Sequence, residues 1–322
     1  MSGTDVARES SFHPELRGAA RWLPRGLVRE WSLWLLKHLP ALPRRMRGST
    51  TVEVRSLAGT SATARIVRSG AADRPGPVVL WIHGGGYVIG SAKVDDAFCA
   101  QIAERLGAVV VSVDYRLAPE HPFPAGLDDC AAAWELVHAE AAALGIDGAR
   151  SIIAGQSAGG GLAAALVQRL VDAGRPLPCL QLLIYPMLDD RTVLRREGNR
   201  HHRVWDHTSN AIAWSMYLAC TPGAAELPAY AAPARRENLR GLPPTWIGVG
   251  TLDLFLDENR EYARRLDEAG VPVELQVVPG AFHAFEMVVP RAPVSRAFVA
   301  SQLEAMKRAL SAPSCRTSGP PA

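Results

Sequence analysis

Two kinds of apolar pattern run along this chain and predict two kinds of strand. Residues 51–57 alternate apolar and polar positions, as half-buried strands do, whereas 77–83 is apolar throughout, as a central parallel strand should be. Eight strands are predicted, at residues 51–57, 62–67, 77–83, 108–114, 151–154, 179–185, 245–250 and 273–278. Helical patterns cover residues 95–106, 125–144, 162–170, 208–219, 257–269 and 293–310. Strands that alternate with helices predict an α/β fold with a doubly wound, mostly parallel sheet.

The strand–helix rhythm is interrupted at two places, and these divide the chain into parts. Residues 189–233 form a charged, irregular insert after a strand end, where sheets of this kind carry their sites. We therefore predict one catalytic domain made of residues 49–188 and 234–312. A helical cap, built jointly by residues 1–48 and 189–233, is predicted to cover it.

The N-terminal segment at residues 14–39 has a helical pattern in which tryptophans and leucines are interspersed with arginines. A basic amphipathic stretch with tryptophans can lie on a membrane surface. The simpler interpretation, which we favour, is that its apolar face packs on the domain beside the site. The polar residues 1–13 and the Pro- and Ser-rich tail at 313–322 are predicted to be disordered.

Composition narrows the class of protein. The 322 residues are 48% hydrophobic and 21% charged, which is typical of a globular protein, and the net charge of +3 gives no case for a nucleic-acid partner. Five scattered cysteines argue against a disulfide framework and a zinc site, and they predict a cytoplasmic location. The N-terminus shows no signal-peptide pattern, and no apolar run approaches the roughly 18–20 residues that span a bilayer, so stable membrane insertion is not expected.

The clearest chemistry lies in Gly155-Gln156-Ser157-Ala158-Gly159, which reads Gly-x-Ser-x-Gly. A predicted strand precedes it and an Ala- and Leu-rich helix follows. A serine between a strand and a helix, flanked by glycines, is typical of the nucleophile elbow, whose strained turn projects the hydroxyl into a cleft. Ser157 is therefore the predicted nucleophile. The N-terminus of the following helix favours the negative charge that develops beside it.

A serine nucleophile needs a base and an orienting acid. Asp253 and His283 each follow a predicted strand, and the chain order Ser, Asp, His is that of α/β-hydrolases. Asp257 and Glu258 are rival acids. We favour Asp253 and interpret Asp257 as the residue that caps the next helix.

The nucleophile also needs donors for an oxyanion, and His83-Gly84-Gly85-Gly86-Tyr87 follows the third strand. Successive glycines let the backbone approach a substrate and present its N–H groups. The N–H groups of Gly84 and Gly85, with that of Ala158, are the predicted oxyanion hole, and His83 is interpreted as a support of the loop. A phosphate-cradling loop is the alternative, but neither Gly-x-Gly-x-x-Gly spacing nor a Lys-Ser/Thr pair follows.

Large side chains near the loop and in the cap are candidates for substrate binding, although packing within the cap explains those of the cap equally well. They are Tyr87, Trp205 and Trp214, with Met216 and Tyr217 as further candidates. The histidines of the insert, His201, His202 and His207, have only Asp206 near them. A metal site would require more ligands at suitable spacing, so we interpret these histidines as a solvated surface and predict no metal and no cofactor.

Taken together, these residues resemble the hormone-sensitive-lipase-like esterases, a capped branch of the α/β-hydrolases, over residues 48–310. The marks are His83-Gly84-Gly85-Gly86, Tyr115-Arg116-Leu117-Ala118-Pro119-Glu120, the elbow, Asp253 and His283. The resemblance implies an α/β-hydrolase fold, a cap made of an N-terminal segment and an insert, and bracing of the oxyanion loop by Arg116 and Glu120. The chain departs from the family at Gln156, where Asp is common, and at Leu254, where Pro is frequent. Gln156 leaves the substrate preference and the pH profile open.

The resemblance further implies hydrolysis of small-molecule carboxylic esters with short or medium acyl chains, without a cofactor. Hydrolysis of amides or carbamates by the same triad is an alternative, and so is a non-catalytic role as a ligand-binding member of the fold. A true lipase would require a large exposed apolar lid surface. Dimers are common in the family, so a homodimer is possible, although no stretch of the sequence argues for an interface.

Overall fold

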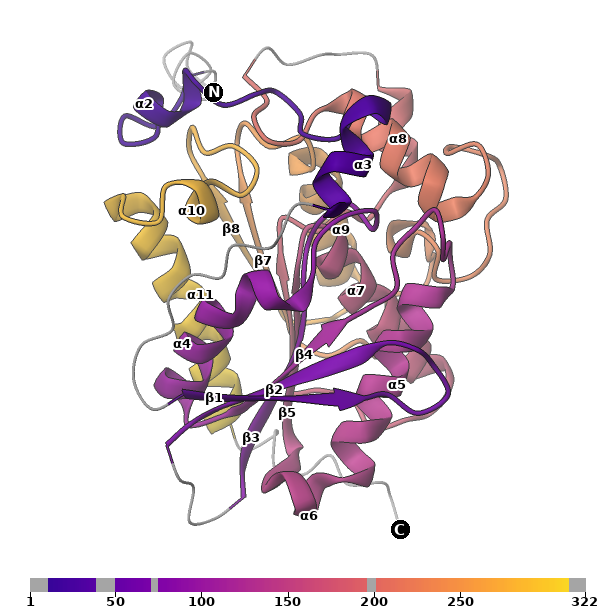
Figure 1. Ribbon diagram of the computed structural model, residues 1–322, viewed down its shortest axis with the longest axis vertical. Helices are drawn as coiled ribbons and strands as arrows, with labels where there is room; N and C mark the ends of the chain where they lie inside the picture. Colours follow the sequence, from indigo (N-terminus) through magenta and orange to yellow (C-terminus); the bar gives the residue numbers. More distant parts are fainter. Residues whose placement is uncertain (1–10, 39–49, 71–74, 196–200, 313–322) are drawn as a thin grey trace.

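A computed structural model of the chain describes residues 11–38, 50–70, 75–195 and 201–312. Its centre is an eight-stranded sheet in the order β1-β2-β4-β3-β5-β6-β7-β8. The strands are β1 (Thr50–Ser56), β2 (Thr63–Ser69), β3 (Gly76–Ile82), β4 (Val109–Asp114), β5 (Ile146–Gln156), β6 (Leu180–Ile184), β7 (Thr245–Gly250) and β8 (Val273–Val278). Strands β3 to β8 are mutually parallel, whereas β1 and β2 pair antiparallel, which confirms the mostly parallel sheet (Figure 1).

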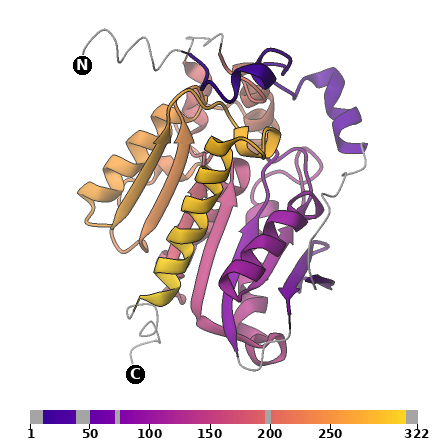
Figure 2. The same ribbon diagram turned by 90° about the vertical axis from the view of Figure 1, so that its left-hand side faces the viewer.

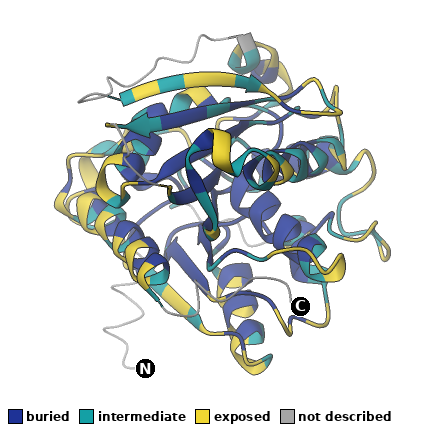
Figure 3. Cartoon of the chain, turned by 90° about the horizontal axis from the view of Figure 1, so that it is seen from below, coloured by how far each residue is buried: buried dark blue, intermediate teal, exposed yellow. Residues whose placement is uncertain are grey.

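Helices cover both faces of the sheet (Figures 1 and 2). One face carries α5 (Ala125–Ala139), α6 (Ala141–Leu144), α7 (Ala158–Asp172) and α9 (Leu256–Glu268), and the other carries α4 (Asp96–Leu106), α10 (Phe285–Val288) and α11 (Pro293–Ser311). Alternation along β3 divides the core accordingly. Leu80 and Ile82 pack with the first group, whereas Val79 and Trp81 pack with the second. Figure 3 shows the buried strands between these layers, with β1 as an exposed edge.

Most predicted elements begin and end within a few residues of the observed ones, and the predicted strands at 245–250 and 273–278 coincide with β7 and β8. The helical pattern at 14–39 is different, because it gives two helices, α2 (Arg17–Ala20) and α3 (Glu30–His38). Pro24 and Gly26 lie between them, and both residue types disfavour a helix interior. The helix predicted at 125–144 is likewise divided at Glu140, and the short helix α10 was not predicted.

The disorder predicted for residues 1–13 is wrong for residues 11–13. The His13 N–H donates to the Gly280 carbonyl at 2.8 Å, and the Phe12 ring lies edge-on to Phe282 with 6.2 Å between centroids. These contacts attach the segment to the loop after β8. Residues 1–10 and the tail at 313–322 lie outside the described residues, as does part of the predicted domain boundary near 48.

The two predicted pieces of the cap meet over the carboxyl ends of the parallel strands (Figure 1). The Leu27 N–H donates to the Val204 carbonyl at 3.0 Å. Arg29, just before α3, forms an ion pair of 2.6 Å with Asp206, the residue that caps α8 (His207–Leu218). Chain segments almost 180 positions apart therefore form one layer above the sheet.

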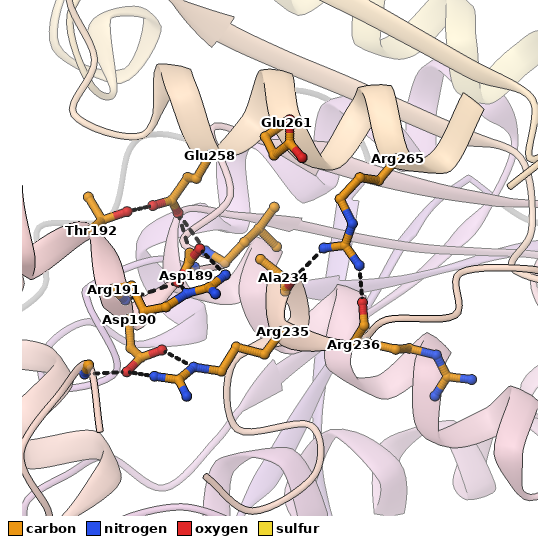
Figure 4. Close-up of polar contacts among 12 residues, drawn as sticks. Asp189, Asp190, Arg191, Thr192, Ala234, Arg235, Arg236, Glu258, Glu261 and Arg265 are labelled. Atoms are coloured by element: carbon orange, nitrogen blue, oxygen red, sulfur yellow. Dashed lines mark hydrogen bonds and ion pairs between the residues drawn. The ribbon is translucent and has the colours of Figure 1, made fainter. Parts of the chain in front are cut away.

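An ion pair with a fully buried carboxylate joins the start of the insert to the residues that follow its end (Figure 4). Asp190 begins the 3₁₀ helix η2 (Asp190–Leu194), and Arg235 ends the 3₁₀ helix η3 (Pro233–Arg235). The Nε and Nη2 atoms of Arg235 donate to the two Asp190 oxygens at 2.7 and 2.8 Å, and the Asp190 side chain is fully buried. The Gly223 N–H is a third donor to the same carboxylate, at 2.5 Å. Asp190 thus connects the start of the insert, its middle at Gly223, and the residues just after its end.

A second carboxylate fixes the start of the insert to α9 (Figure 4). Glu258 accepts the Leu188 N–H at 2.7 Å and the Thr192 hydroxyl, and it is buried. Burial raises the pKa of Glu258 to about 8, because the loss of hydration outweighs these donors, which act in the opposite direction.

Replacing Asp190 with alanine should destabilise the protein, because it removes a fully buried carboxylate and leaves the partly buried Arg235 guanidinium and the Gly223 N–H without their shared acceptor. We expect a loss of about 3 kcal/mol or more in the free energy of unfolding, measured by urea denaturation. Glu261→Ala is the matched control, since Glu261 pairs with Arg264 on the exposed side of α9 and surface pairs contribute little. Equal destabilisation by the two variants would contradict the assignment.

Glu258 should make stability fall as the pH rises. Its folded pKa, about 8, lies above its ordinary value of 4.5, so the contribution is complete below pH 4.5 and is lost as the pH approaches 8. Between pH 5 and 8, wild type should lose stability relative to Glu258→Gln, on the order of 1 kcal/mol per pH unit. Urea unfolding at three pH values measures this difference. A difference that stays constant with pH would refute the linkage.

Candidate active site

The loop between β5 and α7 holds Ser157 in a strained conformation. Ser157 has φ 54° and ψ −120°, in a region that residues other than glycine avoid. A Cβ on Gly155 would lie 2.3 Å from the Gly159 carbonyl oxygen, and one on Gly159 would lie 2.1 Å from that of Ile82. Both positions therefore require glycine. The turn has the geometry of the predicted nucleophile elbow, with the N-terminus of α7 directly behind the serine.

Ser157, His283 and Asp253 form one hydrogen-bonded chain. The Nε2 atom of His283 is 2.9 Å from the Ser157 hydroxyl, and its Nδ1 atom is 2.8 Å from Asp253 Oδ2. All three residues are buried, at 5% exposure or less. The other Asp253 oxygen accepts the Phe255 N–H at 2.9 Å, which fixes the carboxylate. In this arrangement the imidazole can accept the hydroxyl proton, and the carboxylate can stabilise the resulting cation.

Neither rival acid occupies the place of Asp253. Asp257 is exposed and forms an ion pair of 2.9 Å with Arg195, and Glu258 holds the start of the insert. The prediction that Asp257 caps its helix is wrong. The N-cap residue of α9 is Phe255, and Asp257 lies in the first helical turn, where a carboxylate still favours the positive end of the helix dipole.

The glycines after β3 lie beside the serine. A Cβ on Gly84 would be 3.4 Å from the Ser157 Cβ, and one on Gly85, which has φ 119°, would be 1.9 Å from the Ile89 carbonyl oxygen. The N–H groups of Gly84, Gly85 and Ala158 have no acceptor in the described part of the chain. Three backbone donors near one hydroxyl provide what an oxyanion requires.

His83 lies beneath this loop. Its Nδ1 atom is 2.7 Å from the Gly84 carbonyl oxygen, and its ring stacks on Tyr115 with 4.2 Å between centroids. Burial lowers the pKa of His83. A neutral, stacked imidazole in this position supports the loop, which is the role that the sequence predicted.

Arg116 and Glu120 brace different elements. Arg116 binds the fully buried carboxylate of Asp129 on α5 through Nε and Nη2, at 2.8–3.1 Å. Glu120 is exposed and forms an ion pair with Lys37 of α3. The first contact fixes the loop to the domain, and the second connects that loop to the N-terminal segment.

A cavity of about 320 Å³ opens beside Ser157 and His283. Both predicted pieces of the cap contribute to its wall, the N-terminal segment with Leu27 and the insert with Trp205. A Cβ on Gly86 would lie 2.2 Å from the Trp205 ring, so the absence of a side chain there makes room for the indole. The Trp205 and His283 ring centroids are 6.4 Å apart.

Of the three candidate substrate-binding residues, only Trp205 lines this cavity. Tyr87 stacks on Tyr217 with 3.9 Å between centroids, donates its hydroxyl to the Met187 carbonyl, and is 2% exposed. Trp214 is fully buried against the same pair of rings. Tyr87 and Trp214 pack against each other and against Tyr217, and neither lines the cavity. They therefore contribute to packing rather than to the cavity wall.

Gln156, where the family commonly has Asp, faces a carboxylate. Its Nε2 atom donates to both oxygens of Asp95 at 3.1–3.2 Å, and the Trp81 indole N–H donates to Asp95 at 2.8 Å. Gln156 and Asp95 are both buried and line the cavity. The amide thus provides a donor where an acidic side chain would repel the neighbouring carboxylate.

Two buried polar groups beside His283 were not predicted. Tyr185 lies edge-on to the imidazole with 4.6 Å between centroids, and its hydroxyl donates to Glu286. Burial raises the pKa of Glu286 to about 7. His202, expected on a solvated surface, is only 6% exposed, and burial lowers its pKa to about 4. Of these residues, only Glu286 could have been suspected from the sequence, because it lies three residues after His283.

The described residues bring no three His, Cys, Asp or Glu side chains together as a metal site would. None of the described helices is long and apolar enough to cross a membrane. Cys99, Cys130 and Cys220 are free thiols, whereas Cys179 is disulfide-bonded.

Comparisons with known proteins agree with this geometry. A family model described as the alpha/beta hydrolase fold matches residues 79–287, well over half of the chain. Esterase LipI of Mycobacterium tuberculosis is 41% identical over 67% of this chain and 68% of its own length. An ethyl acetate hydrolase of Pseudomonas putida is 36% identical over 65% of this chain and 66% of its own length.

Among solved structures, one titled "Bacterial Heroin Esterase" superposes with a TM-score of 0.86 and 36% identity, over 94% of this chain and 99% of that one. The family match spans the segment from β3 to α10, which contains the glycine loop, the elbow, Asp253 and His283. The chain therefore belongs to the α/β-hydrolase fold family, among its hormone-sensitive-lipase-like esterases.

Proposed function

We propose that this carboxylic ester hydrolase works as a serine esterase through Ser157, His283 and Asp253. The observation that carries the proposal is the continuous hydrogen-bonded chain from the Ser157 hydroxyl through His283 to Asp253, at 2.9 and 2.8 Å. A serine hydroxyl is a weak nucleophile until a base removes its proton as it attacks. The chain provides that base and the acid that orients it.

Acylation follows from this geometry. The Ser157 Oγ attacks the ester carbonyl carbon while His283 Nε2 takes the hydroxyl proton. Asp253 accepts a hydrogen bond from the Nδ1–H of His283, which fixes the orientation of the ring, and stabilises the imidazolium. The tetrahedral intermediate collapses, the bond to the alcohol oxygen breaks, and His283 returns the proton to the leaving alcohol. Deacylation repeats the steps with water, releasing the carboxylic acid and restoring the serine.

The oxyanion of each tetrahedral intermediate would be held by the N–H groups of Gly84, Gly85 and Ala158. These donors have no acceptor among the described residues, so they need no rearrangement when the charge develops. The N-terminus of α7 adds a favourable dipole at the same place.

We infer a preference for esters with short to medium acyl chains. The cavity of about 320 Å³ lies at the small end of ligand pockets, which range from about 300 to 1,000 Å³. Trp205 closes one side of it. The printed name of one relative, an ethyl acetate hydrolase, supports the same size class.

We also propose a cytoplasmic location, on the evidence of the free thiols of Cys99, Cys130 and Cys220. The disulfide at Cys179 argues in the opposite direction. The possible homodimer stays a prediction.

Ser157→Ala should abolish hydrolysis of p-nitrophenyl butyrate, and Asp253→Asn should lower kcat by about 10³–10⁴-fold with a smaller effect on KM. Asp257→Asn is the matched control, since Asp257 is the exposed rival acid, and it should retain wild-type rates. Loss of activity in the Asp257 variant with survival in the Asp253 variant would reverse the assignment.

Across p-nitrophenyl esters from acetate to palmitate, kcat/KM should peak at short or medium chains. Trp205→Ala should move the peak toward longer chains, because it removes one wall of the cavity. If wild type were inactive on every ester while hydrolysing amides or carbamates, the triad would serve another acyl group. Inactivity on all of these, with retained ligand binding in Ser157→Ala, would indicate a non-catalytic binding protein.

A further inference from the structure

Large apolar side chains are exposed along one short part of the N-terminal segment. Five of them lie between residues 22 and 35: Trp22 (90% exposed), Leu27 (39%), Trp31 (80%), Trp34 (69%) and Leu35 (49%). The five remaining tryptophans of the chain are all buried, at 4% exposure or less. Three of them belong to helix α3, and exposed apolar side chains that cluster on a protein surface mark a place of interaction.

Helix α3 has an apolar surface on two sides. Trp31, Trp34 and Leu35 have the i, i+3, i+4 spacing that places side chains on one face, and this face is exposed. Leu33, on the other side, is 7% exposed and packs in the core. The expectation that the apolar face packs on the domain therefore holds for only one side of the helix.

The exposed side is held firmly in place. Arg29 and Lys37, at the two ends of α3, form ion pairs with Asp206 of the insert and Glu120 of the domain. The residues just before α3 contact the start of α8, where the Val28 N–H donates to the Ser209 hydroxyl at 3.2 Å, at the end of the molecule where the parallel strands terminate (Figure 1).

The exposed residues adjoin the mouth of the active-site cavity. Leu27 lines that cavity and is 39% exposed, and Val288, 37% exposed, lines it from α10. Leu27 precedes Trp31 by four residues. A flat partner that covers α3 would therefore also contact the rim of the cavity.

Charge decides which partner fits. Residues 11–38 contain five arginines and lysines against two glutamates. Arg21 and Arg25 are exposed and have no ion-pair partner in the described part of the chain. A second copy docking by a twofold axis would bring these cations against themselves, because such an interface presents the same patch from both sides. An anionic surface neutralises them.

We propose that residues 21–35 dock the protein on the surface of an anionic lipid bilayer, with the mouth of the active-site cavity facing the lipid. Tryptophans prefer the interface between headgroups and acyl chains, and arginines beside them are attracted by anionic lipids. Where the proposed esterase activity holds, the substrates that this position favours are esters dissolved in the membrane.

The test uses the full-length Ser157→Ala protein, so that binding is measured without hydrolysis and independently of the esterase proposal. The protein is sedimented with vesicles of phosphatidylglycerol and phosphatidylcholine, and with vesicles of phosphatidylcholine alone. We expect strong sedimentation with the anionic vesicles and weak sedimentation with the neutral ones, decreasing with added salt. Because the other tryptophans are buried, a blue shift and quenching by brominated lipid report on Trp22, Trp31 and Trp34.

Two double variants remove the proposed contacts. Trp31→Ser with Leu35→Ser should lower the partition coefficient about tenfold or more, since interfacial binding scales with buried apolar area. Arg21→Gln with Arg25→Gln should weaken it about fivefold for each charge. Val54→Ser on the edge strand β1 is the apolar control, and Arg260→Gln with Arg308→Gln on α9 and α11 is the charge control. Val54 is 56% exposed, and both controls should bind as before.

Equal sedimentation of the Trp31/Leu35 variant and its control would overturn the proposal, and so would equal binding to neutral and anionic vesicles. A dimer in sedimentation velocity that this variant abolishes, without vesicle binding, would assign the face to a second copy instead.

In the active protein, the variant should keep wild-type kcat/KM on dissolved p-nitrophenyl butyrate and lose activity on an ester embedded in anionic vesicles. Failure of the esterase itself would appear with dissolved ester, so the two failures are distinguishable.

Discussion

The backbone of Ser157 is held at φ 54°, a conformation that costs a residue with a side chain about 1–3 kcal/mol. The surroundings maintain it. The Ser157 N–H donates to the Ile184 carbonyl at 2.8 Å, and the serine carbonyl accepts the N–H of Met187 at 2.9 Å. Strand β6 and its exit loop therefore hold the turn between them. Backbone atoms lie close to Gly155 and Gly159 on the sides where a side chain would be, so the turn has no room to adopt another conformation. The distance of 2.9 Å between the Ser157 hydroxyl and His283 Nε2 depends on this one residue staying strained.

Around that turn the molecule must keep several buried carboxyl groups apart. Asp253 is satisfied by His283 and the Phe255 N–H, and Asp95 by Trp81 and Gln156. An aspartate at position 156 would face the Asp95 carboxylate, so the neutral amide of Gln156 and the acid at Asp95 suit each other as a pair. In this chain the neighbouring carboxylate of Asp95 favours glutamine over the aspartate that is common in the family.

The sequence predicted the sheet and the proposed catalytic residues better than it predicted the cap. Strands such as β7 and β8 can be predicted from the pattern of a few neighbouring residues, and the elbow is defined by five consecutive residues. Tyr185, Glu286 and His202 could not be found in this way. Tyr185 and Glu286 matter through burial beside His283, and His202 is buried within the insert; burial depends on how segments far apart in the chain pack together. Tyr87 and Trp214 were wrongly predicted to bind substrate for the same reason. The sequence shows that a residue is aromatic, but not whether its ring lines the cavity or packs in the interior.

In the N-terminal segment, the sequence predicted burial for side chains that the structure leaves exposed. Its apolar residues predicted a buried face, and Leu33 and Val28 are indeed buried. A helix with apolar residues on both sides can bury only one side on a single domain, so Trp31 is left 80% exposed. That exposure is costly unless something covers it, since an exposed apolar area forgoes about 25 cal/mol per Å². The ion pairs of Arg29 and Lys37 hold α3 in this orientation even so. The N-terminal segment lines the cavity with Leu27 and exposes Trp31 nearby. This arrangement suits a protein that binds a surface with the mouth of its cavity facing that surface.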